Sequence, residues 1–130
     1  MKKEFIIPLK EKLISFETAK LAKEKKFDIL CEHSFSEHNS AIQENNQNGF
    51  RNWNKEYKNS YSRPTQSLLQ KWLREVHGTI IYVVPFKDIG DDNNDPIRFK
   101  VFTTKTINSK EYKTYEEALE IGLYQALLLI

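Results

Sequence analysis

The stretch that decides the fold is PTQSLLQKWLREVHGTIIYVVPF, residues 64–86. Thr65 is placed to cap a helix at its start, and Gly78 is placed to end it. Between them, apolar residues recur at helical spacing, at Leu68, Leu69, Trp72, Leu73 and Val76. Such a stripe predicts a helix with one buried face. Residues 79–86 are rich in β-branched side chains and predict a strand.

The same reasoning extends to the C-terminus. After a polar turn at 87–95, residues 96–104 predict a second strand, and a short third one is expected near 107–113. Alternation along the second strand places Ile97, Phe99 and Val101 on one face and Arg98 and Lys100 on the other. Thr114 then opens a last helix as a capping box. This order predicts an α+β fold, in which helices cover a small antiparallel sheet of two or three strands.

The N-terminal part adds one helix. Ser15 can cap residues 16–26, in which Phe16, Ala19 and Ala22 form a narrow apolar stripe. Upstream, Phe5-Ile6-Ile7 is a candidate edge strand that Pro8 ends.

Residues 31–62 differ from both flanks in their high density of Asn and Ser. This polarity argues against a continuous core element and predicts a partly ordered segment draped over the core. Phe50, Trp53 and Tyr57 follow i, i+3, i+7, so one short helix is expected near 50–58. We therefore expect one domain (1–130) made of an N-terminal helix arm (1–30), this polar segment (31–62) and an α-β-β-(β)-α core (63–130).

Composition excludes several classes of protein. The chain has 130 residues, of which 39% are hydrophobic and 12% aromatic, and this argues against pervasive disorder. Its formal net charge of +2 is not that of a polybasic nucleic-acid binder. The single cysteine excludes an internal disulfide framework and fits a reducing compartment. No apolar run approaches the length of a membrane span, so we expect a cytoplasmic protein without a membrane partner.

Two groups of side chains bear on catalysis and metal binding. Cys31, His33 and His38 are zinc-type ligands or a nucleophile–base pair, but four zinc ligands, an orienting third residue and an oxyanion loop are not recognisable. The turn aspartates do not follow calcium-loop spacing; they are Asp88, Asp91, Asp92 and Asp95. We expect no catalytic residue, metal or cofactor, and a Cys/His or metal-dependent hydrolase remains an alternative.

A nucleic-acid-binding domain is the other alternative. Helix–strand–strand–strand–helix is also the order of the double-stranded-RNA-binding fold, and Arg98 and Lys100 would contribute to a basic face. However, the last helix begins with Glu116 and Glu117 in its first turn, and these carboxylates repel phosphate. The charge pattern therefore argues against duplex RNA as the partner.

Three stretches together carry a resemblance: residues 16–28, residues 63–77 and residues 112–129 with their Thr-Tyr-Glu-Glu-Ala core. They resemble a group of small uncharacterised proteins encoded by bacteriophages and prophages of gut bacteria. The resemblance implies no particular activity. It implies a phage accessory protein that acts in the cytoplasm of the bacterial host.

We therefore expect a non-enzymatic protein that binds a host protein or a small nucleotide signal used in host defence. The expected binding residues are Phe50, Trp53, Tyr57 and Tyr61, with Arg63 as a charged anchor. The alternative is that these aromatic side chains close the core.

The last helix also suggests self-association. Its surplus of apolar residues, chiefly Leu123, Leu127 and Ile130, predicts a homodimer through this helix. The competing arrangement is that the N-terminal helix covers the same face within one chain.

Overall fold

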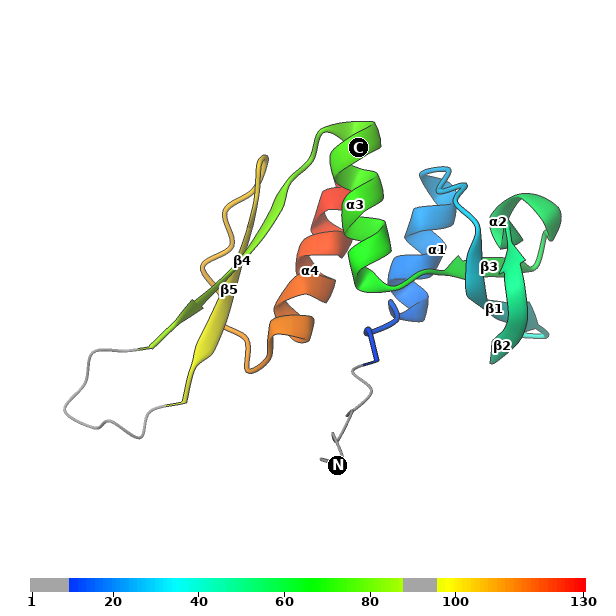
Figure 1. Ribbon diagram of the computed structural model, residues 1–130, viewed down its shortest axis with the longest axis horizontal. Helices are drawn as coiled ribbons and strands as arrows, with labels where there is room; N and C mark the ends of the chain where they lie inside the picture. Colours follow the sequence, from blue (N-terminus) through cyan, green and yellow to red (C-terminus); the bar gives the residue numbers. More distant parts are fainter. Residues whose placement is uncertain (1–9, 88–95) are drawn as a thin grey trace, which may run out of the picture.

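The computed structural model describes residues 10–87 and 96–130 (Figure 1). Its elements are α1 (Phe16–Glu24), β1 (Cys31–His38), β2 (Ala41–Arg51), α2 (Trp53–Glu56), β3 (Ser60–Arg63), α3 (Gln66–His77), β4 (Ile81–Phe86), β5 (Arg98–Thr103) and α4 (Tyr115–Leu128). The strands form two antiparallel sheets, β2-β1-β3 and β4-β5. In Figure 1, α1, α3 and α4 lie between the two sheets. The expected α+β class, with helices covering small antiparallel sheets, is confirmed.

The three long helices begin and end close to the residues predicted to cap them. The hydroxyls of Ser15, Thr65 and Thr114 accept hydrogen bonds from backbone N–H groups in the first turns of α1, α3 and α4. Gly78 ends α3 in the left-handed conformation, with φ of 65°. These ends depend on local chemistry, and this explains why the sequence pattern predicts them. In α3 the predicted stripe is buried at Leu69, Trp72 and Leu73, whereas Val76 in the last turn is 60% exposed.

The second sheet, β4-β5, packs one face against α4. Gly122 makes this contact possible, because a Cβ atom there would lie 2.5 Å from Val101 Cγ2 and 2.9 Å from Ile81 Cγ2. The expected third strand near 107–113 is reduced to two isolated bridges, Phe99↔Tyr112 and Phe102↔Ile107. Both bridges lie on the β5 side, so β4 forms the outer edge of the sheet.

The first sheet, β2-β1-β3, corrects the expectation of a draped, partly ordered segment over 31–62. The hairpin β1–β2 and the short strand β3 pair through their backbones, which needs no apolar side chains. Only a narrow strip faces the core, where Phe35 and Tyr61 each pack edge-on against Phe16 at ring distances of 5.4 and 5.2 Å. Many of the Asn and Ser residues therefore lie in paired strands, of which only β2 is mostly exposed among its described side chains.

The short helix expected near 50–58 is only one turn long, and Phe50 is not part of it. Phe50 belongs to β2, which has an irregularity opposite the start of β1, whereas α2 begins at Trp53. The i, i+3, i+7 face therefore does not exist. What remains is the pair Trp53 and Tyr57, whose rings stack at 5.6 Å.

The helix α4 is covered more completely than its sequence suggested. Leu123 and Leu127, expected to be exposed surplus, are fully buried, because α1 packs on α4 from one side and the β4-β5 sheet from the other. Leu128 and Leu129 are instead the exposed leucines at its end. The competing arrangement, with α1 covering α4, is the one observed. The homodimer stays a prediction, and light scattering tests it.

Two further points concern membrane-spanning helices and the predictions that fall outside the described residues. Within 10–87 and 96–130, no helix combines the length and apolar character that crossing a bilayer requires. The candidate strand at Phe5-Ile6-Ile7 and the turn aspartates of 88–95 lie outside the described residues.

Candidate functional site

The expected binding residues differ in how exposed they are. Phe50 is 68% exposed and Tyr57 is 43% exposed, whereas Trp53 is only 7% exposed. The indole Nε1 of Trp53 donates to the Cys31 carbonyl at 2.8 Å, which ties α2 to the start of β1. Trp53 thus closes the end of the first sheet, as the alternative interpretation of these aromatics supposed.

Tyr61 and Arg63 are engaged within the chain. The Tyr61 hydroxyl donates to Glu37 Oε2 at 2.9 Å, and burial, followed by this carboxylate, raises the pKa of the phenol. Arg63 lies with its guanidinium 4.4 Å from the Phe35 ring centre, donates through Nε to the Ile14 carbonyl at 2.9 Å, and pairs with Glu44 at 3.2 Å. A ligand would have to compete with these contacts.

Cys31, His33 and His38 are spread along β1. Cys31 is buried at one end of the strand and His38 is exposed at the other, about 23 Å away at 3.3 Å per residue. Burial raises the pKa of the Cys31 thiol, and His33 Nδ1 is engaged by Asn46 Oδ1 at 2.8 Å. Within the described ranges no three Asp, Glu, His or Cys side chains gather as metal ligands would. The geometry therefore does not assemble the hydrolase site that these residues suggested.

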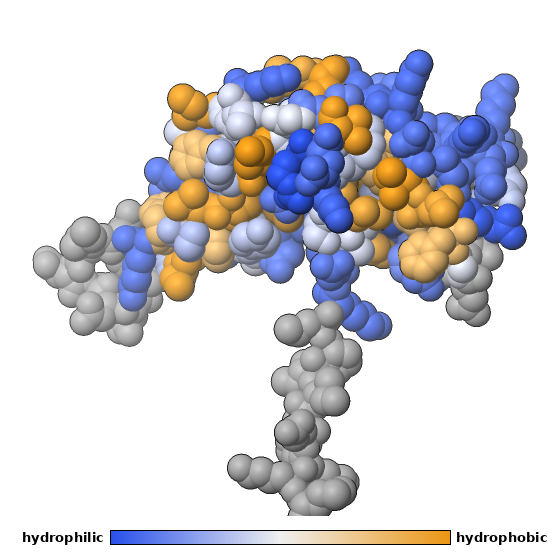
Figure 2. All heavy atoms as spheres, turned by 45° about the horizontal axis from the view of Figure 1, so that its top comes forward, coloured by the Kyte–Doolittle hydropathy of each residue, from blue (hydrophilic) through white to orange (hydrophobic). Residues whose placement is uncertain are grey.

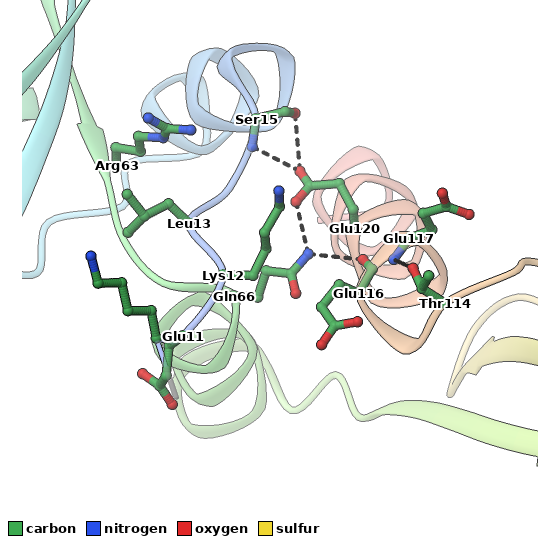
Figure 3. Close-up of a pocket in the computed structure, with 11 residues that line it drawn as sticks. Glu11, Lys12, Leu13, Ser15, Arg63, Gln66, Thr114, Glu116, Glu117 and Glu120 are labelled. Carbon is green, nitrogen blue, oxygen red and sulfur yellow. Dashed lines mark hydrogen bonds between the residues drawn. The ribbon is translucent and has the colours of Figure 1, made fainter. Parts of the chain in front are cut away.

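A pocket of about 780 Å³ opens where three helices begin (Figure 3). The first turns of α1, α3 and α4 meet there around the Glu120 carboxylate. Its Oε2 accepts from the backbone N–H of Ser15 at 3.1 Å, from the Ser15 hydroxyl at 3.0 Å and from the Thr18 hydroxyl. Its Oε1 accepts from Gln66 Nε2 at 3.0 Å, and the same amide donates to the Glu116 carbonyl at 2.9 Å.

These bonds explain the pocket without a ligand. Helix starts carry partial positive charge, so a carboxylate at their meeting point is favoured. Glu120 supplies that negative charge, and its four donors come from α1 and from the first turn of α3. We therefore interpret this site as a polar joint that holds three helices together.

A different surface combines aromatic rings with cations. Because Ile81 and Val101 face α4, the residues that alternate with them point away from it. We call these residues the outer face; they are Tyr82, Val84, Phe86, Arg98, Lys100 and Phe102. Tyr82 is 49% exposed and Val84 is 43% exposed. Figure 2 shows apolar and hydrophilic side chains next to one another at the end of the molecule that carries this sheet.

The outer face is ordered by cross-strand pairs. Tyr82 lies opposite Phe102, Val84 opposite Lys100 and Phe86 opposite Arg98. The Lys100 ammonium is 4.9 Å from the centre of the Phe86 ring. Neither β4 nor β5 contains an acidic residue, so the face carries positive charge alone.

Sequence patterns predicted the β5 half of the outer face but not the β4 half. Alternation placed Arg98 and Lys100 on the face opposite Val101, and the structure confirms that placement. It could not place Tyr82 and Phe86, because both sets of alternating residues in β4 are apolar. The information that would have assigned Tyr82 and Phe86 to the outer face is the pairing register of β4 with β5, and this register depends on the turn between the strands.

The chain matches no protein-family model, no curated protein and no solved structure, so its function is argued from its own geometry.

Proposed function

We propose that this protein acts by binding, without catalysis, and that its ligand docks on the outer face. One observation carries the proposal: among residues 10–87 and 96–130, α4 covers one side of the β4-β5 sheet, and on the other side Tyr82 and Val84 are exposed beside the half-buried rings of Phe86 and Phe102. A cluster of exposed large apolar residues is typical of an interaction site. Here the cluster also contains two cations.

The chemistry of the outer face favours a nucleotide as the ligand. Tyr82 and Phe102 offer flat rings on which a base can stack. Lys100 and Arg98 lie two and four pairs further along the register, on the same face, where they can contact phosphate. A nucleotide presents both groups at once. Of the two expected partners, this supports the small nucleotide signal.

The phage resemblance supplies the setting of the proposal. A protein that holds a nucleotide signal without converting it lowers the free concentration of that signal. In the cytoplasm of a bacterial host, this would counter a defence response that depends on the signal. The proposed role is thus that of a phage-encoded accessory protein that sequesters a nucleotide.

The test is a binding titration of the purified chain with a panel of mono-, di- and cyclic dinucleotides. A ligand at 100 times its Kd should raise the free energy of unfolding by about 2.7 kcal/mol. Tyr82→Ala should abolish most of this stabilisation, and Tyr57→Ala, at an exposed tyrosine just after α2, should not. The ligand should be recovered unchanged after incubation. Stabilisation that is identical in both variants, or conversion of the ligand, would contradict the proposal.

A host protein remains the second candidate because Phe50 on β2 and Tyr57 just after α2 are exposed. If a host protein is the partner, a complex with the purified partner should survive Tyr82→Ala and be lost with Phe50→Ser. Size-exclusion chromatography of the mixed components distinguishes the two patterns.

A further inference from the structure

The outer face is longer than one nucleotide needs. Along β4, Tyr82 and Phe86 are four residues apart, which corresponds to about 13 Å at 3.3 Å per residue. A single base that stacks on the Tyr82–Phe102 pair therefore leaves the Phe86 ring unused. At the rise of about 3.4 Å per nucleotide of a stacked DNA strand, the same length accommodates about four nucleotides.

Positive charge continues beyond the sheet on the β5 side. Residues 96–113 contain five cations and one carboxylate: Arg98, Lys100, Lys105, Lys110 and Lys113 against Glu111. Lys105 and Lys110 are exposed in the segment that follows β5. The turn at the opposite end of β4 contains four aspartates in the sequence. A polyanion that lies along the outer face is therefore favoured to continue beyond the Tyr82–Phe102 pair toward Lys105, and not beyond Arg98 toward the aspartates.

From this length and charge pattern we infer that the outer face binds a single-stranded nucleic acid, with bases stacked on Tyr82, Phe102 and Phe86 and phosphates at Lys100 and Arg98. The inference rests on the proposed function and deepens it, because it extends the ligand from a nucleotide to a strand of nucleotides. Rings interleaved with cations bind single strands with little sequence preference. Duplexes are disfavoured, because their bases are already stacked on one another and present no free ring faces.

The experiment measures the fluorescence anisotropy of a labelled ten-nucleotide single strand of mixed sequence, and of the duplex made from it. The single strand should bind more tightly than the duplex. Its affinity should fall as salt rises from 50 to 200 mM, with a slope in log–log form of about −0.7 for each phosphate contacted. Contacts from both cations of the outer face predict a slope near −1.4.

Two variants test the assigned roles. Tyr82→Ala should weaken binding by at least about fivefold, the lower end of what the loss of one stacked base causes. Lys100→Gln should reduce the magnitude of the salt slope by about 0.7. Matched controls are Tyr57→Ala just after α2 and Lys71→Gln on α3; both residues are exposed, and neither change should alter affinity or slope.

The outcomes separate this inference from the proposed function. If mononucleotides bind and the single strand binds no more tightly, the strand inference is wrong and the proposed function stands. If neither binds, both are wrong. If Tyr82→Ala and Tyr57→Ala lower the affinity for the single strand equally, the assignment of the binding site to the outer face is wrong. Light scattering that shows a dimer lost in Tyr82→Ala would assign the face to a second copy of the chain and overturn the inference.

Discussion

The two sheets of this protein are built alike and exposed in opposite ways. In the first sheet, the aromatic strip of Phe35 and Tyr61 is covered by α1, and much of the remaining surface is polar. In the second sheet, apolar side chains lie on both faces, but α4 covers only one of them. Because one helix covers one face of each sheet, the comparison teaches that the residue types on the uncovered face decide where apolar surface stays exposed.

The edges of the two sheets differ as well. On β4, Gln70 Nε2 donates to the Ile81 carbonyl at 3.2 Å, and Pro85 lacks an N–H; both features discourage pairing of this edge with another strand. The edge strand β2 is interrupted near Gly49, whose φ is 124°. An irregularity of this kind discourages edge-to-edge pairing. The exposed face of β4-β5, and not its edge, is therefore the feature that separates the second sheet from the first.

The largest expected effect tests which tryptophan belongs to the main core. Trp72 is buried on α3 and packs edge-on against Phe27 at 5.2 Å, so Trp72→Ala should lower the free energy of unfolding by about 3–5 kcal/mol. Trp53 lies outside the main hydrophobic cluster, and Trp53→Ala should cost about 1–2 kcal/mol. Denaturant midpoints measure both, and equal losses would show that the end of the first sheet contributes as much to stability as the main core around α3.

The next effect concerns the covered face of the second sheet. Gly122→Ala introduces a Cβ into contact with Val101 and Ile81 and should destabilise the protein by about 1–3 kcal/mol through overpacking. Glu116→Ala, on an exposed position of the same helix, serves as the control and should change stability little. If Gly122→Ala leaves the free energy of unfolding unchanged, α4 is not held closely against β4-β5.

Hydrogen exchange compares the two regions directly. Amides of β2 should exchange before those of α3 and β5, because β2 is an edge strand whose described side chains are mostly exposed. Protection of residues 41–46 as strong as that of residues 68–76 would contradict this order.

The smallest effect involves Cys31, at the start of β1. Burial raises the pKa of its thiol, so alkylation of the folded protein by iodoacetamide should be far slower than in denaturant. Because the folded state holds this proton more tightly than the unfolded chain, stability should fall as pH rises above about 8.5. Cys31→Ala should show a smaller alkaline loss than the wild type. Rapid alkylation of the native protein would instead revive the hydrolase alternative.

Sequence patterns predicted the parts of the fold that depend on near neighbours. The caps at Ser15, Thr65 and Thr114, the C-terminal Gly78 and the strands on either side of the 87–95 turn all follow from local chemistry. The candidate site was different. A helical spacing that the chain does not adopt placed the expected aromatics of 31–62 on one surface. In β4, the residues of both faces are apolar, so the sequence did not indicate which face α4 would cover.

By itself, the sequence determined the α+β class, the helix ends and the positive charge of the outer face, because capping and alternation act within a few residues. Only the tertiary structure decided that α1 and β4-β5 bury Leu123 and Leu127, and that Trp53 closes a sheet instead of offering a contact. It alone also decided that Tyr82 faces solvent. The physical reason is that burial is a property of pairs of surfaces, and the surface that covers a residue can come from anywhere along the chain.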